Sequence, residues 1–579
     1  MGRRALGWRR GLVRAVAGCL LALGAVATPV HASAPAWGLT TSAPDPEAST
    51  PAPLAPTESP EPTPTPTAEP TPEPTPTEAT AEPTPTADPD PTPTPTPATT
   101  VAPIPPAVTT STVGLPTLLI AGAVLAAGAV LVGLLLRRQR TTTEPTPTAA
   151  VTPPANETPA IVLESMAGLG TAMIDSGYPV GLVRGTLEEM AAANGLPAAS
   201  AVVFPTSILV SSSEEGTAQT RAVGAGDRPA LLYQVDAVDR IAGVARSRPA
   251  SAGWVRRQLE RTRALPRPFS APQRIAAYAL LSGALSVLVG SSLPGMLLAA
   301  LLGVGVGTLL LVTDRLSAVY RALAVVGASL GVSLVVLLVA RFVDPGVLPA
   351  IVAPLIMLLP GGLLTIAAIE LATGDIMSGA ARVAAGAMRL LLLSTGIVAA
   401  SALIGVPGVT STEWPLGPVA PWLAVAVFGI GIGIYQCAKP RSIGWIIVVL
   451  YVAYGAQVIG DVFFDGVLSA LVGAAAMTPV AIVIARQRTG PPALVSFLPA
   501  FWLLVPGALG LIGVAGVLEG DASGTGTIVT TIATMVSIAL GVLIGLAATG
   551  SVRGLRNAPI EDWMREEAGG REAAGRRSG

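Results

Sequence analysis

The chain is short of the residues on which most enzymes and metal sites depend. Among 579 residues it has one histidine, His31, two cysteines, Cys19 and Cys437, and one lysine, Lys439. His31 lies beside a predicted signal-peptide cleavage site, so the processed chain would have no histidine for a Ser-His-Asp triad or a metal site. Both cysteines lie in apolar segments, which argues against a disulfide framework. We therefore expect no catalytic residues, no metal and no other cofactor.

Charged residues are also scarce, at 12% of the chain, whereas 51% of residues are hydrophobic. Soluble proteins are about a quarter charged. Most of the apolar runs lie in residues 275–550, which predicts an integral membrane protein. No phosphate-binding loop or dinucleotide fingerprint is present, so hydrolysis of a nucleotide by this chain is not expected. No basic tract suggests nucleic acid as a partner, and the nearly exclusive use of arginine is typical of a GC-rich bacterial genome.

The amino-terminal segments predict export of a long polar stretch. Residues 1–32 have the basic start, apolar run and small-x-small site of a signal peptide, although an uncleaved anchor or a lipoprotein box at Cys19 stays open. Residues 33–112 consist mainly of Pro, Thr, Ala and acidic residues, with repeats such as TPTPTP. Such a composition cannot bury a core and favours extended polyproline II. It predicts a disordered extracellular stalk, either a spacer through a cell wall or an unselected low-complexity tail.

One membrane span is predicted over residues 113–136, and Arg137, Arg138 and Arg140 follow it. Because positive residues stay in the cytoplasm, the stalk is expected outside and the following residues inside. A second Pro/Thr-rich linker covers residues 141–158.

Residues 160–265 predict a small cytoplasmic α/β domain. We expect helices over residues 161–175, 180–193 and 235–246, and strands over 201–204, 207–211 and 220–223. At the end of this domain, Trp254, Val255 and Leu259 share one helical face beside four arginines. This pattern predicts a basic amphipathic helix on the membrane surface or, alternatively, an ordinary surface helix of the domain.

The rest of the chain predicts ten membrane spans, at residues 272–290, 294–312, 320–340, 348–372, 382–404, 420–437, 442–459, 465–485, 493–517 and 527–549. Arginines concentrate in alternate loops, which supports this count and places residues 551–579 in the cytoplasm as a tail. The spans divide into two groups of five, residues 272–404 and 420–549. An odd number of spans per group inverts the second group relative to the first. The expected fold class is therefore an α-helical polytopic membrane protein with two inverted five-span repeats and the small α/β domain.

The fourth span of each group contains the same unusual pattern. Pro360 and Gly361 interrupt the first and Glu370 follows, whereas Pro506 and Gly507 interrupt the second and Glu519 follows. Proline inside a helix removes a backbone hydrogen bond. In lipid, the freed groups need partners in protein or in a water-filled cavity. Paired interrupted spans therefore predict a binding site between two repeats.

Further polar residues near the span ends extend this candidate substrate and proton path. Asp314 and Asp461 each follow the second span of their group, at opposite membrane edges. Asp461 and Asp465, four residues apart, predict an outer gate or a cation site, and Gln457 lies one turn earlier. The alternatives are solvated residues at span ends and, for the prolines, kinks that serve packing.

Three stretches carry a resemblance to a known family. They are ESMAGLGTAMIDSGYPVGLVRGTLEEMAAANGL at residues 164–196, PTSILVSSS at 205–213 and LLPG at 358–361. Together with the plan of residues 160–550, they resemble the threonine/serine exporter family, as an actinobacterial-type member with an added signal, stalk and span. The resemblance implies a secondary exporter of threonine and serine in the bacterial plasma membrane, driven by protons. It implies no residue-level site, and the oligomeric state, including a homo-oligomer, stays open.

Two other functions remain possible from the sequence. A membrane-anchored wall sensor or attachment protein would use the stalk as its working part. A membrane-bound hydrolase would use the α/β domain, with Ser207, Ser211, Asp227 and Asp236 as its polar residues. The lack of a histidine and of a nucleophile elbow argues against the hydrolase.

Overall fold

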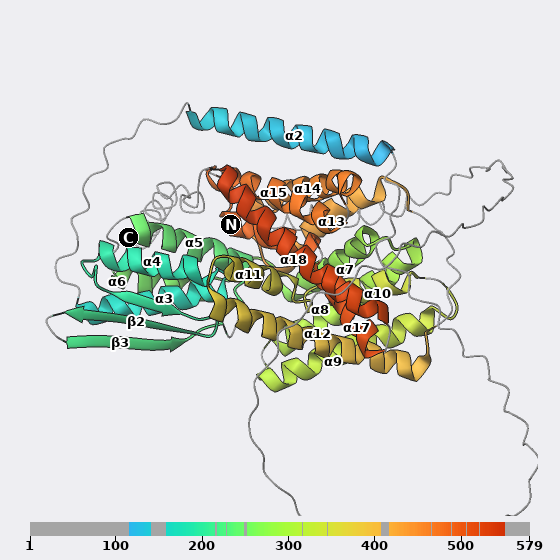
Figure 1. Ribbon diagram of the computed structural model, residues 1–579, viewed down its shortest axis with the longest axis horizontal. Helices are drawn as coiled ribbons and strands as arrows, with labels where there is room; N and C mark the ends of the chain where they lie inside the picture. The colour runs from blue at the N-terminus through green and yellow to red at the C-terminus, as the bar shows by residue number, and fades with distance from the viewer. Residues whose placement is uncertain are drawn as a thin grey trace, which may run out of the picture. The chain divides into compact units, whose positions relative to one another are not determined.

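The computed structural model describes twelve ranges of the chain, residues 115–140, 158–214, 217–226, 229–247, 252–314, 316–343, 345–406, 416–464, 466–487, 489–504, 506–519 and 522–549 (Figure 1). All of these residues belong to one compact unit. The predicted signal peptide, stalk and tail, and the linker as far as residue 157, lie outside the described residues.

The predicted α/β domain contains four helices and a three-stranded antiparallel sheet in the order β1-β2-β3. The elements are α3 (Pro159–Asp175), α4 (Val180–Ala193), β1 (Ser200–Val203), β2 (Ser207–Glu214), β3 (Thr217–Gly224), α5 (Leu232–Ser247) and α6 (Ala252–Ala264). Helix α3 packs on β2 and β3, and α4 packs on β1. Ile208 and Val210 of β2 are fully buried beneath these helices, in line with the alternation expected for a strand with one covered face. The helices and strands expected from the sequence are present.

Helix α6 belongs to this domain and does not present its apolar face to a membrane. Val255 and Leu259 are buried in the hydrophobic core of the domain, and Trp254 packs against that core. The hydroxyl of Ser165 on α3 donates a hydrogen bond of 2.7 Å to the carbonyl of Ala252. The prediction of an amphipathic helix on the membrane surface is therefore wrong, because the domain already covers the face that would enter lipid.

The remaining described chain is helical. It consists of α2 (Leu115–Arg140), α7 (Ala271–Leu288), α8 (Leu293–Thr313), α9 (Ala318–Val339), α10 (Val347–Val352), the 3-10 helix η1 (Ala353–Leu355), α11 (Gly361–Ala372), α12 (Ile376–Ile404), α13 (Ala420–Tyr435), α14 (Pro440–Phe463), α15 (Gly466–Ala485), α16 (Ala493–Leu503), α17 (Pro506–Leu518) and α18 (Ala522–Ala548).

Eight membrane-spanning candidates stand out among the described helices by length and apolar composition. They are α2, α8, α9, α12, α14, α15, the α16–α17 segment and α18. A ninth is the pair α10 and α11, which is bent by 64°. Helix α13 has only 16 residues, fewer than the roughly 20 that cross a membrane without tilt or thinning. The protein is thus a multi-pass membrane protein, and the count of ten core spans stays a prediction.

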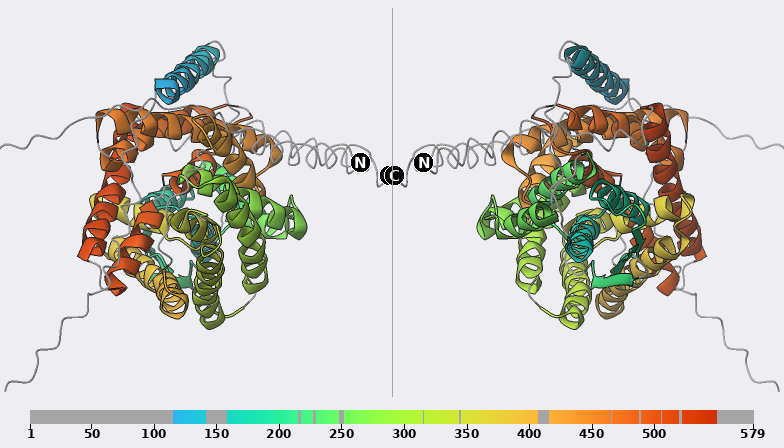
Figure 2. Two further views of the ribbon diagram at one scale, coloured as in Figure 1. Left: turned by 90° about the vertical axis from the view of Figure 1, so that its right-hand side faces the viewer. Right: turned by 90° about the vertical axis from the view of Figure 1, so that its left-hand side faces the viewer.

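Packing partners recur between the helices α7–α12 and α13–α18. Helix α9 packs on α12 as α15 packs on α18, and α11 packs on α12 as α17 packs on α18. The two groups also contact each other in a matching way, because α12 contacts α17 and α18 contacts α11. The C-terminal helices (red) lie beside those of residues 350–400 (yellow to orange) in Figure 2. These pairs are compatible with an internal repeat, and its inverted orientation stays a prediction.

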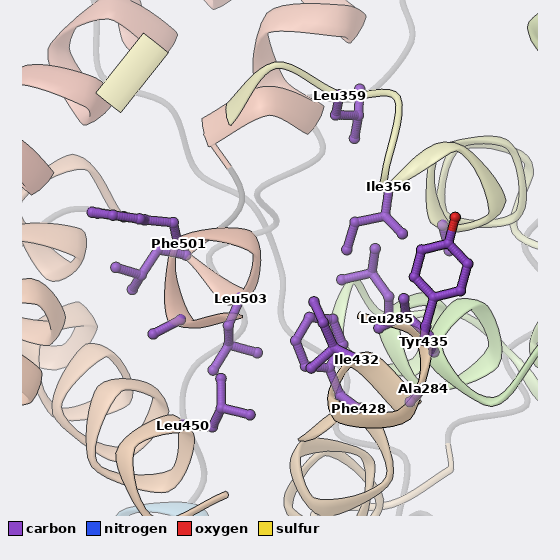
Figure 3. Packing of buried hydrophobic residues seen from close by; sticks show 14 of the residues in the cluster. Ala284, Leu285, Ile356, Leu359, Phe428, Ile432, Tyr435, Leu450, Phe501 and Leu503 are labelled. Atoms are coloured by element: carbon purple, nitrogen blue, oxygen red, sulfur yellow. The ribbon is translucent and has the colours of Figure 1, made fainter. Parts of the chain in front are cut away.

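Glycine allows the first helices of the two groups to approach closely. An added Cβ at Gly431 of α13 would lie 2.9 Å from the backbone oxygen of Ala277 and from the backbone nitrogen of Leu281, both on α7. Small residues permit this kind of backbone contact in membrane helices. Figure 3 shows the adjoining core, in which Leu285 of α7, Ile432 of α13 and Ile356 from the broken span face one another.

Replacing this glycine should therefore destabilise the fold. We expect Gly431→Ala to cost about 1–3 kcal/mol, because the two helix backbones must move apart. Gly305→Ala on α8 is the matched control, since no atom lies within 4 Å of the added Cβ. Thermal unfolding in detergent measures both variants. Equal melting temperatures for the two would contradict the close contact of α7 with α13.

Candidate functional site

The interruption predicted at Pro360 and Gly361 is a genuine break in the helix. Helix α10 ends at Val352 and η1 ends at Leu355, and α11 begins at Gly361 with Pro360 as its N-cap. The carbonyl of Pro360 accepts the first helical hydrogen bond from Leu364, at 2.9 Å. Ile356, Leu358 and Leu359 in the break are buried. The irregular backbone therefore lies within protein, as the lack of water in a bilayer requires.

The second copy of the pattern is interrupted without a comparable bend. Helix α16 ends at Leu503, and Pro506 and Gly507 are the first two residues of α17. Residues Ala493–Leu518 nevertheless count as one span. Proline is tolerated at the first position of a helix, where its missing N–H has no helical partner to lose. The repeated sequence thus has different geometry in its two copies.

Glu370 ends the broken span as a completely buried carboxylate. Its Oε2 accepts a hydrogen bond of 3.0 Å from Nε of Arg382 on α12. Its Oε1 accepts one of 3.1 Å from the backbone N–H of Val180, the first residue of α4. A carboxylate at a helix N-terminus satisfies a free N–H and interacts favourably with the helix dipole. Glu370 therefore joins α11, α12 and the α/β domain.

One hydrogen-bond donor of Arg382, its Nη2, has no partner among the described residues. The side chain is 9% exposed, and this nitrogen is buried. A buried donor without a partner is costly, and a guanidinium is suited to bind a carboxylate. Sequence reasoning counted Arg382 only as a positive residue of a loop. Its position as the first residue of the predicted span 382–404 was the available signal.

A second acidic contact lies beside this pair. Asp375 precedes α12 as its N-cap and lies 3.5 Å from Nη2 of Arg184 on α4. An added Cβ at Gly181 would lie 2.7 Å from the same carboxylate. The first two turns of α4 thus rest on the corner between α11 and α12.

The other predicted site residues lie elsewhere. Asp314 is the exposed C-cap of α8, Gln457 is half-buried on α14, and Asp461 is exposed in the last turns of α14. Asp465 lies outside the described residues. Glu519, the counterpart of Glu370, is exposed and accepts a hydrogen bond of 2.8 Å from the hydroxyl of Ser401. The outer gate or cation site therefore stays a prediction.

Comparison with known proteins identifies a family for part of the chain. Residues 164–404 match the family described as "Putative threonine/serine exporter". This match runs from α3 through α12, so it includes the α/β domain, the broken span and Arg382, whereas α2 and α13–α18 lie outside it. No curated protein and no solved structure matches the chain. The resemblance stated from the sequence is confirmed over the matched residues.

The buried ion pair of Glu370 and Arg382 leads to a prediction about the free energy of unfolding. We expect Glu370→Leu alone to cost about 3–5 kcal/mol, because it leaves a buried guanidinium without its counter-charge. The double variant Glu370→Leu/Arg382→Leu removes both charges and should recover most of that loss. Thermal unfolding of the purified protein in detergent is the measurement. A single variant as stable as the unaltered protein would show that the pair does not form.

Proposed function

Because residues 164–404 match the family described as "Putative threonine/serine exporter", we propose that the protein exports small hydroxy amino acids. The observation that carries this proposal is the buried pair of Glu370 and Arg382 at the end of the broken span. An amino acid is a zwitterion, and the two side chains match its two charges. The unused Nη2 of Arg382 would bind the substrate carboxylate, and Glu370 would bind its ammonium.

We further propose that protons drive the export. Glu370 is a buried carboxylate next to the substrate, so it can hold either the ammonium group or a proton. Exchange between the two would couple efflux of the amino acid to entry of a proton. The recurring packing pairs of α7–α12 and α13–α18 support alternating access, in which one group rocks against the other.

The direct test is efflux of labelled threonine from cells that express the protein. We expect efflux to fall when a protonophore collapses the proton gradient, and Arg382→Gln to reduce efflux at least tenfold through loss of the carboxylate ligand. Deletion of residues 33–112 should leave efflux intact. Loss of efflux in that deletion alone would favour the wall-sensor function over the exporter.

The proposed orientation places residues 160–265 and 551–579 in the cytoplasm and residues 33–112 outside, on the basis of the arginine asymmetry. In a variant without Cys19 and Cys437, we expect an impermeant thiol reagent to label a cysteine at Thr75 in intact cells. A cysteine at Ser247 should react only after the cells are opened. The reverse pattern of labelling would invert the topology.

A further inference from the structure

The α/β domain contacts the helical core at several places, among them α16, which contacts α5 and whose Leu494 packs against the hydrophobic core of the domain. Two other places differ in character. At the first place, Leu232, Tyr233 and Val235 from the start of α5 lie within the hydrophobic cluster of the core itself. The N–H of Leu232 donates a hydrogen bond of 2.9 Å to the carbonyl of Gln436, which follows α13. We call this contact the anchor.

A buried charge cluster forms part of the anchor. Asp236 on α5 is 2% exposed and pairs both with Arg240, at 3.1 Å, and with Lys439, the residue before α14. Burial tends to raise the pKa of Asp236, but the ammonium of Lys439 and the guanidinium of Arg240 outweigh it and hold this pKa below its usual range. Asp236 is thus occupied in an ion pair, which also argues against its role in a hydrolase.

The loop between α13 and α14 is shaped for this contact. Cys437 has a φ of 56°, and among the described residues it is the one non-glycine with a positive φ. The N–H of Ala438 returns to the carbonyl of Gly433 at 2.7 Å and closes the turn after α13. A left-handed conformation at a residue with a side chain costs about 1–2 kcal/mol, so surrounding contacts must maintain it.

At the second place, polar groups of α4 contact the corner of α11 and α12. The contacts are the hydrogen bond from Val180 to Glu370 and the ion pair of Arg184 with Asp375. Arg184 is 51% exposed, and an exposed ion pair contributes only about 0–1 kcal/mol. We call this contact the latch.

We propose that the domain stays fixed to α13 and α14 through the anchor, while the latch opens and closes during transport. This inference rests on the proposed function. When the latch is closed, the N–H of Val180 occupies Oε1 of Glu370, where a substrate ammonium or a proton would bind. Arg382, Asp375 and Arg184 are the other charged groups around this position. In this state Glu370 is also completely buried, so the closed latch keeps substrate away from Glu370 and the domain gates the site from its own side.

A disulfide across the latch tests this gate. In a chain without Cys19 and Cys437, Gly181→Cys and Asp375→Cys bring two thiols together, because a Cβ at position 181 would lie 3.7 Å from Cγ of Asp375. We expect oxidation to reduce threonine efflux at least tenfold and a reductant to restore it. The matched control is Ser200→Cys/Ser211→Cys, which links β1 to β2 within the domain at residues paired in register. Oxidation of the control should leave efflux unchanged.

The outcomes separate the two proposals. Absence of threonine efflux from the unaltered protein overturns the proposed function. Equal efflux from the oxidised and reduced latch variants, with efflux present, overturns the latch. Hydrogen exchange of the unaltered protein gives a readout independent of transport. Amides in the first turn of α4 should exchange at least tenfold faster than those in the first turn of α5, and equal protection of the two turns also overturns the latch.

Discussion

A carboxylate buried in apolar surroundings must find both a counter-charge and hydrogen-bond donors, and Glu370 imposes this requirement on the whole assembly. Its two oxygens are satisfied by Arg382 of α12 and by the first amide of α4. One side chain therefore links two membrane helices to a domain helix. The irregular backbone before α11 is tolerated because it lies within protein, where Ile356 and Leu359 are buried.

The α/β domain packs directly against the helical core. Helix α5 contributes side chains to the hydrophobic cluster of the membrane helices, whereas α4 contributes backbone and charged groups at their edge. Apolar burial is non-directional and persists through small displacements, but a single hydrogen bond is lost over an ångström or so. This difference in chemistry is why we propose that the apolar anchor persists during transport while the polar latch opens.

The sequence predicted the positions of helices and breaks better than it predicted which distant residues contact one another. The boundaries of α4 and the break at Pro360 follow from glycine, proline and apolar spacing, which act within a few residues. The partners of Glu370 could not be read in this way, because Val180 lies 190 residues away along the chain. Likewise, the arginine-rich α6 has a surface-helix pattern, and only tertiary packing decides that Val255 and Leu259 face the domain.

The one lysine of the chain, Lys439, lies in the anchor, so a reagent that modifies side-chain amines would act there alone. Lys439 carries the one side-chain amine in 579 residues, and the structure places it, 28% exposed, on the carboxylate of Asp236. Neutralising that amine by acylation would leave a buried carboxylate with Arg240 as its remaining partner. An amine-directed reagent would thus modify a single side chain, at the point where the domain meets the membrane helices. The protein carries its own site-specific reporter of whether that junction is closed.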